Sequence, residues 1–273
     1  MLKYRCITAA ILIPVVVYTV LFLETIWFGL LMAVFVSLAA WEWAGLSGYP
    51  NRSCIFYQAV VVISLGVAYQ LSNAILVHVL VSAGIIWWGC GFVLVILYQK
   101  GWNVIPSKKF IKAGIGMLIL VPAWVSIVAL HARLPDGVDM VLFLLILIWV
   151  ADSAAYMAGS RWGKRKLASN VSPGKTWEGT GSAFIASIGV GLGYALLSGI
   201  QGINILFFLC VCLVTVLFSV LGDLVESLFK RLAEKKDSGH LLPGHGGVMD
   251  RLDSLTAASP VFLAGVWVLE GKI

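Results

Sequence analysis

The chain alternates long apolar runs with short polar links. About nine runs are predicted, at residues 7–23, 26–46, 55–71, 75–98, 111–131, 140–159, 180–199, 203–221 and 256–270. Nearly all are long enough to cross the ~30 Å hydrocarbon core of a bilayer as helices. They lack the residue-by-residue alternation of membrane β-strands. The pattern predicts an all-α, polytopic integral membrane helical bundle that forms a single membrane domain over 1–273.

Composition excludes a soluble fold, because 60% of residues are hydrophobic and only 12% are charged, with a mean hydropathy of +0.98. The basic N-terminal segment, residues 1–5, resembles the start of a signal peptide. The run that follows it exceeds the usual length of a signal-peptide core, and no small-residue cleavage site comes after it. We therefore expect the first run to be a retained span.

Positive charge is distributed unevenly between alternate links. The N-terminus and every second link together hold 17 of the 19 lysines and arginines, and the opposite set holds only Arg133 and Lys272. Because basic residues concentrate on the cytoplasmic side of membrane proteins, this bias predicts nine spans with the N-terminus inside and the C-terminus outside.

Two links are longer and more polar than the others, at 160–179 and 222–255. The charge bias places both on the cytoplasmic side. The chain is thus expected to consist of N-terminal spans over 1–110 and catalytic spans over 111–273, the latter including both cytoplasmic loops.

Four acidic residues lie inside or at the edge of predicted spans. Asp223 and Glu226 are three apart and so share a helix face, while Asp152 and Glu42 stand alone between apolar neighbours. A carboxylate within a bilayer is costly unless it is paired or bound to a metal. Simple neutralisation by a nearby Lys or Arg is the alternative; it is favoured for Glu42 and disfavoured for Asp223.

The loop at 169–179 offers groups that suit a phosphate. Pro173-Gly174 predicts a turn, and Lys175 and Thr176 follow just before a span. The first glycine of a Walker A loop is missing and no strand is predicted before it, so a P-loop is excluded. A helix N-terminus with a lysine and hydroxyls still favours phosphate binding. A solvated basic loop facing anionic lipid is the alternative.

The most polar part of the chain is 227–253. Its glycine-rich segment 242–247 is expected to present backbone N–H groups to an anion. Asp250 and Asp253 would share a helix face, and paired carboxylates suit Mg²⁺ better than zinc. For His240 and His245, the alternative to a role in the site is a structural role as hydrogen-bonded side chains. Carboxylates, basic residues and glycine turns, without a Ser-His-Asp set, favour metal-assisted phosphate chemistry.

One long pattern resembles a family signature. Residues 227–253 read Ser-x-Phe-Lys-Arg-x4-Lys-Asp-x-Gly-x2-Leu-Pro-x-His-Gly-Gly-Val-x-Asp-Arg-Leu-Asp, which is similar to the signature of the CDP-diacylglycerol synthase (phosphatidate cytidylyltransferase) family. Segments 172–179 and 222–231 also resemble segments of that family. The motifs cover roughly the C-terminal 40% of the chain, and the N-terminal spans match only in length and hydropathy.

The resemblance implies that CTP and phosphatidate give CDP-diacylglycerol and diphosphate, with Mg²⁺ held by Asp223 and Asp250 and a second cation left open. It implies a bacterial inner-membrane enzyme of phospholipid biosynthesis whose site faces the cytoplasm. Expected partners are the two substrates and membrane lipid, without nucleic acid; a homodimer is left open. The catalytic residues implied are Asp223, Asp250, Lys175, His245 and Arg251, and the substrate-binding residues are Ser172, Thr176, Glu178, Lys230, Arg231, Lys236, Asp237 and Asp253.

That chemistry agrees with the polar inventory. A phosphate monoester has a second pKa of about 6 and is largely ionised at neutral pH, so no general base is needed. Basic side chains are expected to neutralise the phosphates, with Asp237 and Asp253 orienting them. The alternatives are another CTP-dependent lipid enzyme, such as a polyprenol kinase or CDP-archaeol synthase, and a non-enzymatic transporter that uses its buried acids for ion coupling.

Overall fold

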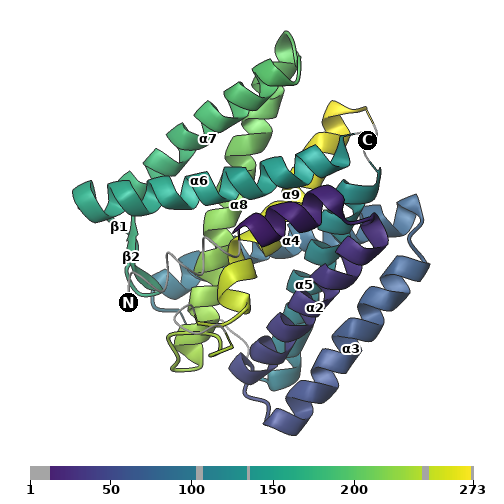
Figure 1. Ribbon diagram of the computed structural model, residues 1–273. Helices are drawn as coiled ribbons and strands as arrows, with labels where there is room; N and C mark the ends of the chain where they lie inside the picture. The colour runs from purple at the N-terminus through teal and green to yellow at the C-terminus, as the bar shows by residue number, and fades with distance from the viewer. Residues whose placement is uncertain (1–12, 103–106, 134–135, 242–245, 272–273) are drawn as a thin grey trace.

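The protein is a bundle of long helices with one small β-hairpin (Figure 1). The computed structural model describes residues 13–102, 107–133, 136–241 and 246–271. A first helix spans Ile13–Phe22. The remaining elements are α2 (Thr25–Leu46), α3 (Asn51–Gln70), α4 (Ala74–Gln99), α5 (Lys109–Arg133), α6 (Gly137–Trp162), β1 (Lys166–Ala168), β2 (Ser172–Thr176), α7 (Trp177–Leu197), α8 (Ile203–Leu232) and α9 (Met249–Leu269).

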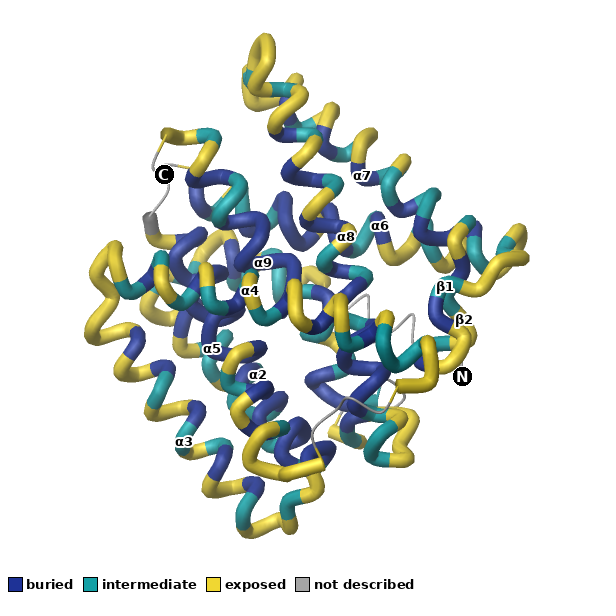
Figure 2. The backbone as a smooth tube through the Cα atoms, turned by 180° about the vertical axis from the view of Figure 1, so that it is seen from behind, coloured by how far each residue is buried: buried dark blue, intermediate teal, exposed yellow. Residues whose placement is uncertain are grey.

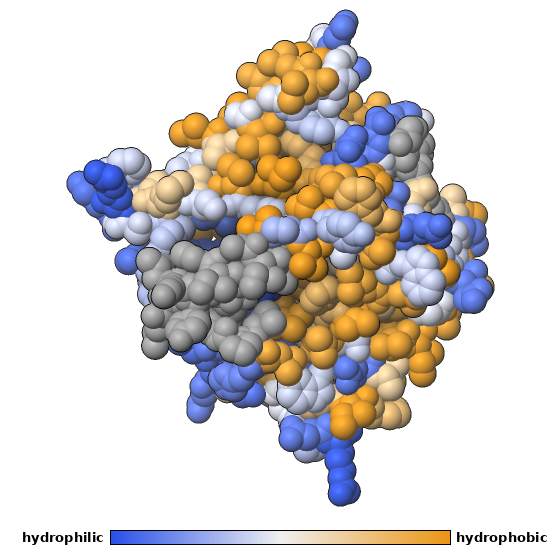
Figure 3. Space-filling model, viewed as in Figure 1, coloured by the Kyte–Doolittle hydropathy of each residue, from blue (hydrophilic) through white to orange (hydrophobic). Residues whose placement is uncertain are grey.

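The helices confirm the predicted all-α membrane bundle. Within the described ranges, eight helices are long and apolar enough to cross a membrane. The first predicted span lies partly outside those ranges, and its described part is the shorter apolar helix Ile13–Phe22. Apolar side chains cover most of the face shown in Figure 3, with polar side chains gathered at its margins. Such a surface suits lipid rather than water.

Two helices form the centre of the bundle. The apolar segments of α5 and α9 are 83% and 61% buried, against 28–44% for the other spanning helices. Figure 2 shows α3 and α7 with exposed outer sides and α5 and α9 largely enclosed. α9 packs most extensively against α8, and α5 contacts α2, α4, α6 and α9. The position of α9 at the centre determines where its first residues can meet other helices.

Links that are far apart in sequence meet at one end of the bundle. The Trp43 indole N–H donates to the Lys112 carbonyl oxygen over 2.8 Å, which joins the last turns of α2 to the start of α5. Asn170 in the hairpin donates to the Gln99 carbonyl oxygen at the end of α4. All of these are predicted cytoplasmic links, so their common location fits the charge pattern. The N-in, C-out orientation stays a prediction.

The two long loops are shorter than predicted. α8 continues to Leu232 and α9 begins at Met249, so only 233–248 lie between them. The polar residues near these ends extend the helices instead of interrupting them, because helical turns beyond the apolar segment satisfy their own backbone groups. The predicted loop bounds 222–255 were therefore too wide, and Asp223 and Asp250 lie on helices, as the three-residue spacing of each acid from its partner predicted.

The other predicted loop contains the hairpin, an exception to the all-α fold. Its strands are antiparallel, with Lys166 paired to Thr176 and Ala168 to Ser172. The turn predicted at Pro173-Gly174 is wrong: those residues lie in β2, and the turn is at 169–171. Proline is tolerated there because both strands of a two-stranded sheet are edges, where a missing N–H costs little.

Candidate active site

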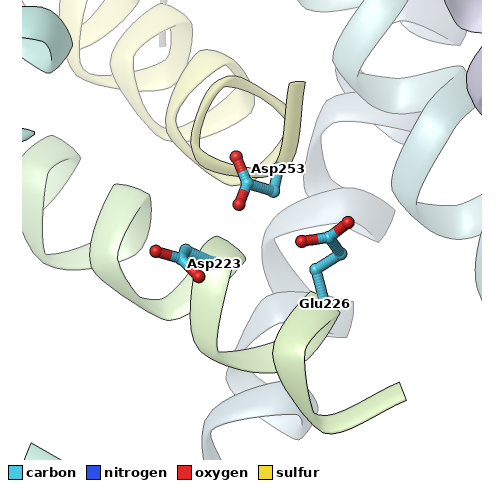
Figure 4. Close-up of side chains that lie close together, drawn as sticks. All are labelled: Asp223, Glu226 and Asp253. Atoms are coloured by element: carbon cyan, nitrogen blue, oxygen red, sulfur yellow. The ribbon is translucent and has the colours of Figure 1, made fainter. Parts of the chain in front are cut away.

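Three carboxylates from two helices converge at the polar end of the bundle. Asp223 and Glu226 come from α8 and Asp253 from α9, and one oxygen of each lies within 4.8 Å of the other two. Figure 4 shows the three side chains around a common gap, with Asp253 reaching in from the facing helix. We refer to Asp223, Glu226 and Asp253 as the acid group. Three negative charges this close repel one another unless a cation is added.

Close packing of α8 against α9 brings these carboxylates together. A methyl group at Gly222 would overlap the backbone carbonyl of Asp253, so the small residue allows the two helices to approach at this level. Asp223 comes directly after Gly222, and Glu226 follows one turn later on the same face. The short sequence Gly-Asp-x-x-Glu therefore determines both the spacing of the carboxylates and the contact with the facing helix.

Two lysines neutralise the acid group in part. Lys175 lies 2.8 Å from Asp223, and it also donates to the Val220 carbonyl oxygen over 3.2 Å. Lys230 lies 2.6 Å from Glu226 and 2.7 Å from Asp250. The Glu226 side chain is only 1% exposed. Its Oε2 accepts from Lys230, whereas its Oε1 is buried without a hydrogen-bond partner within the described part of the chain.

The charge balance of the site suits a divalent cation. The acid group and Asp250 supply four carboxylates, and Lys175 and Lys230 supply two ammonium groups, which leaves two negative charges when all are ionised. The candidate ligands are oxygens only, and the unpartnered Glu226 oxygen lies among them. Hard cations such as Mg²⁺ prefer such ligands. The carboxylates of the acid group therefore fit a bound divalent cation.

Asp250 lies beside the acid group rather than within it. Its Oδ1 accepts from Lys230, and its Oδ2 accepts from the backbone N–H groups of Ser238 over 3.0 Å and Gly247 over 2.7 Å. Both oxygens are therefore engaged, and Asp250 would have to exchange one of these bonds to bind a metal. The structure joins Asp223 to Glu226 and Asp253 instead of to Asp250. The predicted metal pair, Asp223 with Asp250, stays a prediction.

The hairpin delivers Lys175 to the site and uses its neighbours for support. The Thr176 hydroxyl caps α7 by accepting from the Gly179 N–H, and Thr176 is 4% exposed. Glu178 accepts from the backbone N–H groups of Lys164 and Arg165, each over 3.2 Å. Both side chains thus hold the hairpin against α7, and these contacts differ from the predicted substrate binding. Ser172 is half-buried in β2.

The remaining predicted residues lie outside the acid group. Arg231 donates through Nε to the Val171 carbonyl oxygen over 3.2 Å, and Arg251 is exposed on the first turn of α9. Lys236 and Asp237 are exposed and line a cavity of about 540 Å³. His245 lies outside the described residues, so its predicted catalytic role is untested.

Two acids that the sequence singled out, but that were not assigned to the site, lie in or near it. Glu226 belongs to the acid group, and its position three residues after Asp223 was the available signal. Asp152 of α6 lies close enough to Lys175 and Asp223 to interact electrostatically with both. The location of Asp152 within an apolar run indicated that its carboxylate must be paired or bound, but the neighbouring sequence did not identify the partner.

One backbone amide of the glycine-rich segment 242–247 is already engaged, as are the two that follow the segment, and residues 242–245 lie outside the described ranges. The Gly247 N–H donates to Asp250, and the N–H groups of Val248 and Met249 donate to Glu42. Backbone donors that already bind the protein's own carboxylates are not available to a substrate phosphate without rearrangement.

Comparison with known proteins identifies the relatives of this chain. A protein from Pseudomonas aeruginosa named phosphatidate cytidylyltransferase is 42% identical over 98% of this chain and 97% of its own length. Proteins of the same name from Haemophilus influenzae and Brucella suis are 36% and 34% identical over 96% and 89% of this chain, and over 97% and 86% of their own lengths. The sequence model of the cytidylyltransferase family matches residues 3–269. This chain therefore belongs to the cytidylyltransferase family.

Proposed function

We infer that this chain is a phosphatidate cytidylyltransferase, which forms CDP-diacylglycerol and pyrophosphate from CTP and phosphatidate in phospholipid biosynthesis. The observation that supports this most strongly is 42% identity over 98% of the chain to a relative of that name. The acid group agrees with it, because reactions between two phosphates require charge neutralisation more than they require a nucleophilic side chain.

The reaction places specific demands on the site. An oxygen of the phosphatidate phosphate forms a bond to the α-phosphorus of CTP, and the bond from that phosphorus to the pyrophosphate oxygen breaks. The attacking phosphate has a second pKa of about 6 and is already largely ionised at neutral pH. The reaction is therefore opposed mainly by repulsion between the two anionic substrates, and not by the need to remove a proton. Ammonium and guanidinium groups therefore matter more than a general base.

We propose that Asp223, Glu226 and Asp253 hold Mg²⁺. When bound, Mg²⁺ supplies Lewis-acid stabilisation of charge on the phosphate oxygens. The unpartnered Glu226 Oε1 and the two excess negative charges support this assignment.

Lys175 and Lys230 are proposed to contact the substrate phosphates. Each ammonium lies against an acid-group carboxylate, at 2.8 Å and 2.6 Å respectively, so each is held at the centre of the site. A lysine ammonium has three donor positions, which allows it to keep one carboxylate and still bind a phosphate oxygen. Arg231, Arg251 and Lys236 are proposed to add positive charge at the rim.

We propose that the end of the bundle bearing the site faces the cytoplasm of a bacterial inner membrane. The charge pattern supports this orientation, since that end bears nearly all basic links. CTP would then reach the site from water and phosphatidate from the lipid. The division into N-terminal spans over 1–110 and catalytic spans over 111–273 is part of the same proposal.

Product analysis tests the proposed function. Purified protein is incubated with labelled CTP and, in separate reactions, phosphatidate, a polyprenol and an unsaturated archaeol phosphate. The expected result is CDP-diacylglycerol and pyrophosphate from phosphatidate. Release of CDP with a phosphorylated polyprenol, or transfer only to the ether lipid, would reject the substrate assignment.

A further inference from the structure

Glu42 is a buried acid far from the signature motifs, and its environment differs from the predicted one. It lies near the end of α2 and is 2% exposed. Neutralisation by a neighbouring Lys or Arg was favoured for it, yet none of the ion pairs within the described ranges involves Glu42. Its carboxylate is instead surrounded by N–H and O–H donors.

Three hydrogen bonds connect Glu42 to residues about 200 positions later. Its Oε1 accepts from the Val248 N–H over 3.1 Å, and its Oε2 accepts from the Met249 N–H over 2.8 Å and from the Ser238 hydroxyl over 2.9 Å. The first N–H groups of a helix lack partners within that helix. The N-cap of α9, Val248, has no side chain that could supply one. Glu42 therefore caps α9 from a different helix, and its negative charge also suits the positive end of the helix dipole.

The same contacts continue to the acid group. Ser238 donates its hydroxyl hydrogen to Glu42 and its backbone N–H to Asp250. Asp250 accepts from Lys230, which also donates to Glu226. A continuous series of hydrogen bonds thus runs from α2, through the segment after α8, to the buried ligand candidate Glu226. We call Glu42 and Asp250 the anchor pair. Glu42 accepts from the backbone N–H groups of Val248 and Met249, and Asp250 accepts from those of Ser238 and Gly247.

Glycines in the segment allow Glu42 to approach. A methyl group at Gly247 would overlap the Ser238 hydroxyl and a carboxylate oxygen of Glu42, and one at Gly239 would overlap the same carboxylate. These glycines give room for a protein carboxylate. Their presence is explained without a bound phosphate.

We propose that Glu42 is a positioning residue for the transferase: it fixes Ser238 and the first turn of α9, and so sets Asp250, Lys230 and Glu226 in place. It touches no reacting group itself. Partners that hold ligand side chains in orientation commonly affect rates by about 10- to 100-fold when they are removed. This inference rests on the proposed function.

The test uses Glu42→Gln, with Glu24→Gln as the matched control. Gln has nearly the same shape but replaces one acceptor oxygen with an amide N–H₂ group that faces backbone donors. Glu24 undergoes the same charge change at the opposite, exposed end of α2. Hydrogen–deuterium exchange is measured on peptides covering Val248 and Met249, and kcat and KM are measured for both substrates.

We expect Glu42→Gln to speed exchange at the start of α9 and to lower kcat per folded enzyme by about 10- to 100-fold, with KM nearly unchanged. Glu24→Gln should match wild type in both measurements. Unchanged exchange, or unchanged kcat with only a lower yield of folded protein, would overturn the proposal. If wild type itself releases no pyrophosphate, the proposed function fails, while exchange still decides whether Glu42 anchors the start of α9.

Ser238→Ala provides a second test that keeps the charge of Glu42 and removes one of its three bonds. It should show a smaller effect in the same direction. Adding Ser238→Ala to Glu42→Gln should cost less than the sum of the two single effects, because both residues belong to one network. Additive effects would contradict the linkage from Glu42 to Asp250. If Glu42→Gln does not fold, Ser238→Ala alone decides: unchanged exchange at the start of α9 and unchanged kcat would overturn the proposal.

Discussion

The acid group and the anchor pair are both sets of carboxylates at the same end of the bundle, yet their surroundings are opposite. In the anchor pair, both oxygens of Glu42 and both of Asp250 accept hydrogen bonds from N–H or O–H groups or from Lys230. The acid group brings three carboxylates within 4.8 Å of one another and leaves Glu226 Oε1 unpartnered, as far as the chain is described. Hydrogen-bonded carboxylates stabilise a fold, whereas a buried carboxylate oxygen without a partner is costly and calls for an explanation such as a bound ion or a catalytic role.

Removal of the proposed metal ligands should produce the largest effect. Asp223→Asn, Glu226→Gln and Asp253→Asn should each lower the rate of pyrophosphate release by about 1000-fold, since metal coordination contributes several kcal/mol to stabilising phosphate charge. Excess chelator should abolish wild-type activity, and added Mg²⁺ should restore it. Persistence of activity in chelator would show that the acid group has a structural role like that of the anchor pair.

Lys230 joins the two groups, so replacing it tests whether they depend on each other. Lys230→Met leaves Glu226 and Asp250 buried without their cation, and breaking such a pair typically costs about 3–5 kcal/mol. We expect a clear loss of thermal stability in detergent, which millimolar Mg²⁺ partly reverses. Lys100→Met, at an exposed position after α4, serves as the control and should change stability by less than about 0.5 kcal/mol. Equal stability of the two variants would contradict the ion pairs.

Asp250 distinguishes the two groups most sharply, because the sequence assigned it to the metal and the structure places it in the anchor pair. Asp250→Asn should lower kcat by about 10- to 100-fold through displacement of Lys230, with little change in the Mg²⁺ concentration that gives half-maximal activity. A large rise in that concentration would show instead that Asp250 is a metal ligand, as the sequence predicted.

Thr176 tests whether the hairpin residues support the fold or bind substrate, and its expected effect is the smallest. Thr176→Ala removes the cap of α7 and should cost about 1 kcal/mol of stability. Thr176→Ser keeps the hydroxyl and should retain most of that stability. If Thr176→Ala raises the KM for CTP without lowering stability, the predicted substrate contact is correct and the cap is secondary.

Much of the fold was predictable from hydropathy and charge, but the detailed positions were not. Apolar runs located the spans, and Asp223 with Glu226 predicted one shared helix face. The ends of α8 and α9 were missed because polar residues extend a helix beyond the lipid without any change in hydrophobic period. The cap of α9 was unpredictable, since Glu42 meets Val248 only through packing of distant helices. Tertiary contacts across about 200 residues leave no local signal in one sequence.

The measurement that tests the account most directly is the Mg²⁺ dependence of pyrophosphate release from CTP and phosphatidate in Glu226→Gln and Glu42→Gln, side by side with wild type. We predict that Glu226→Gln raises the half-saturating Mg²⁺ concentration by at least about tenfold, because it removes a ligand oxygen. Glu42→Gln should leave that concentration within about twofold of wild type and lower only kcat. The reverse pattern, with Mg²⁺ dependence altered by Glu42→Gln and unaffected by Glu226→Gln, would contradict the division between metal site and anchor.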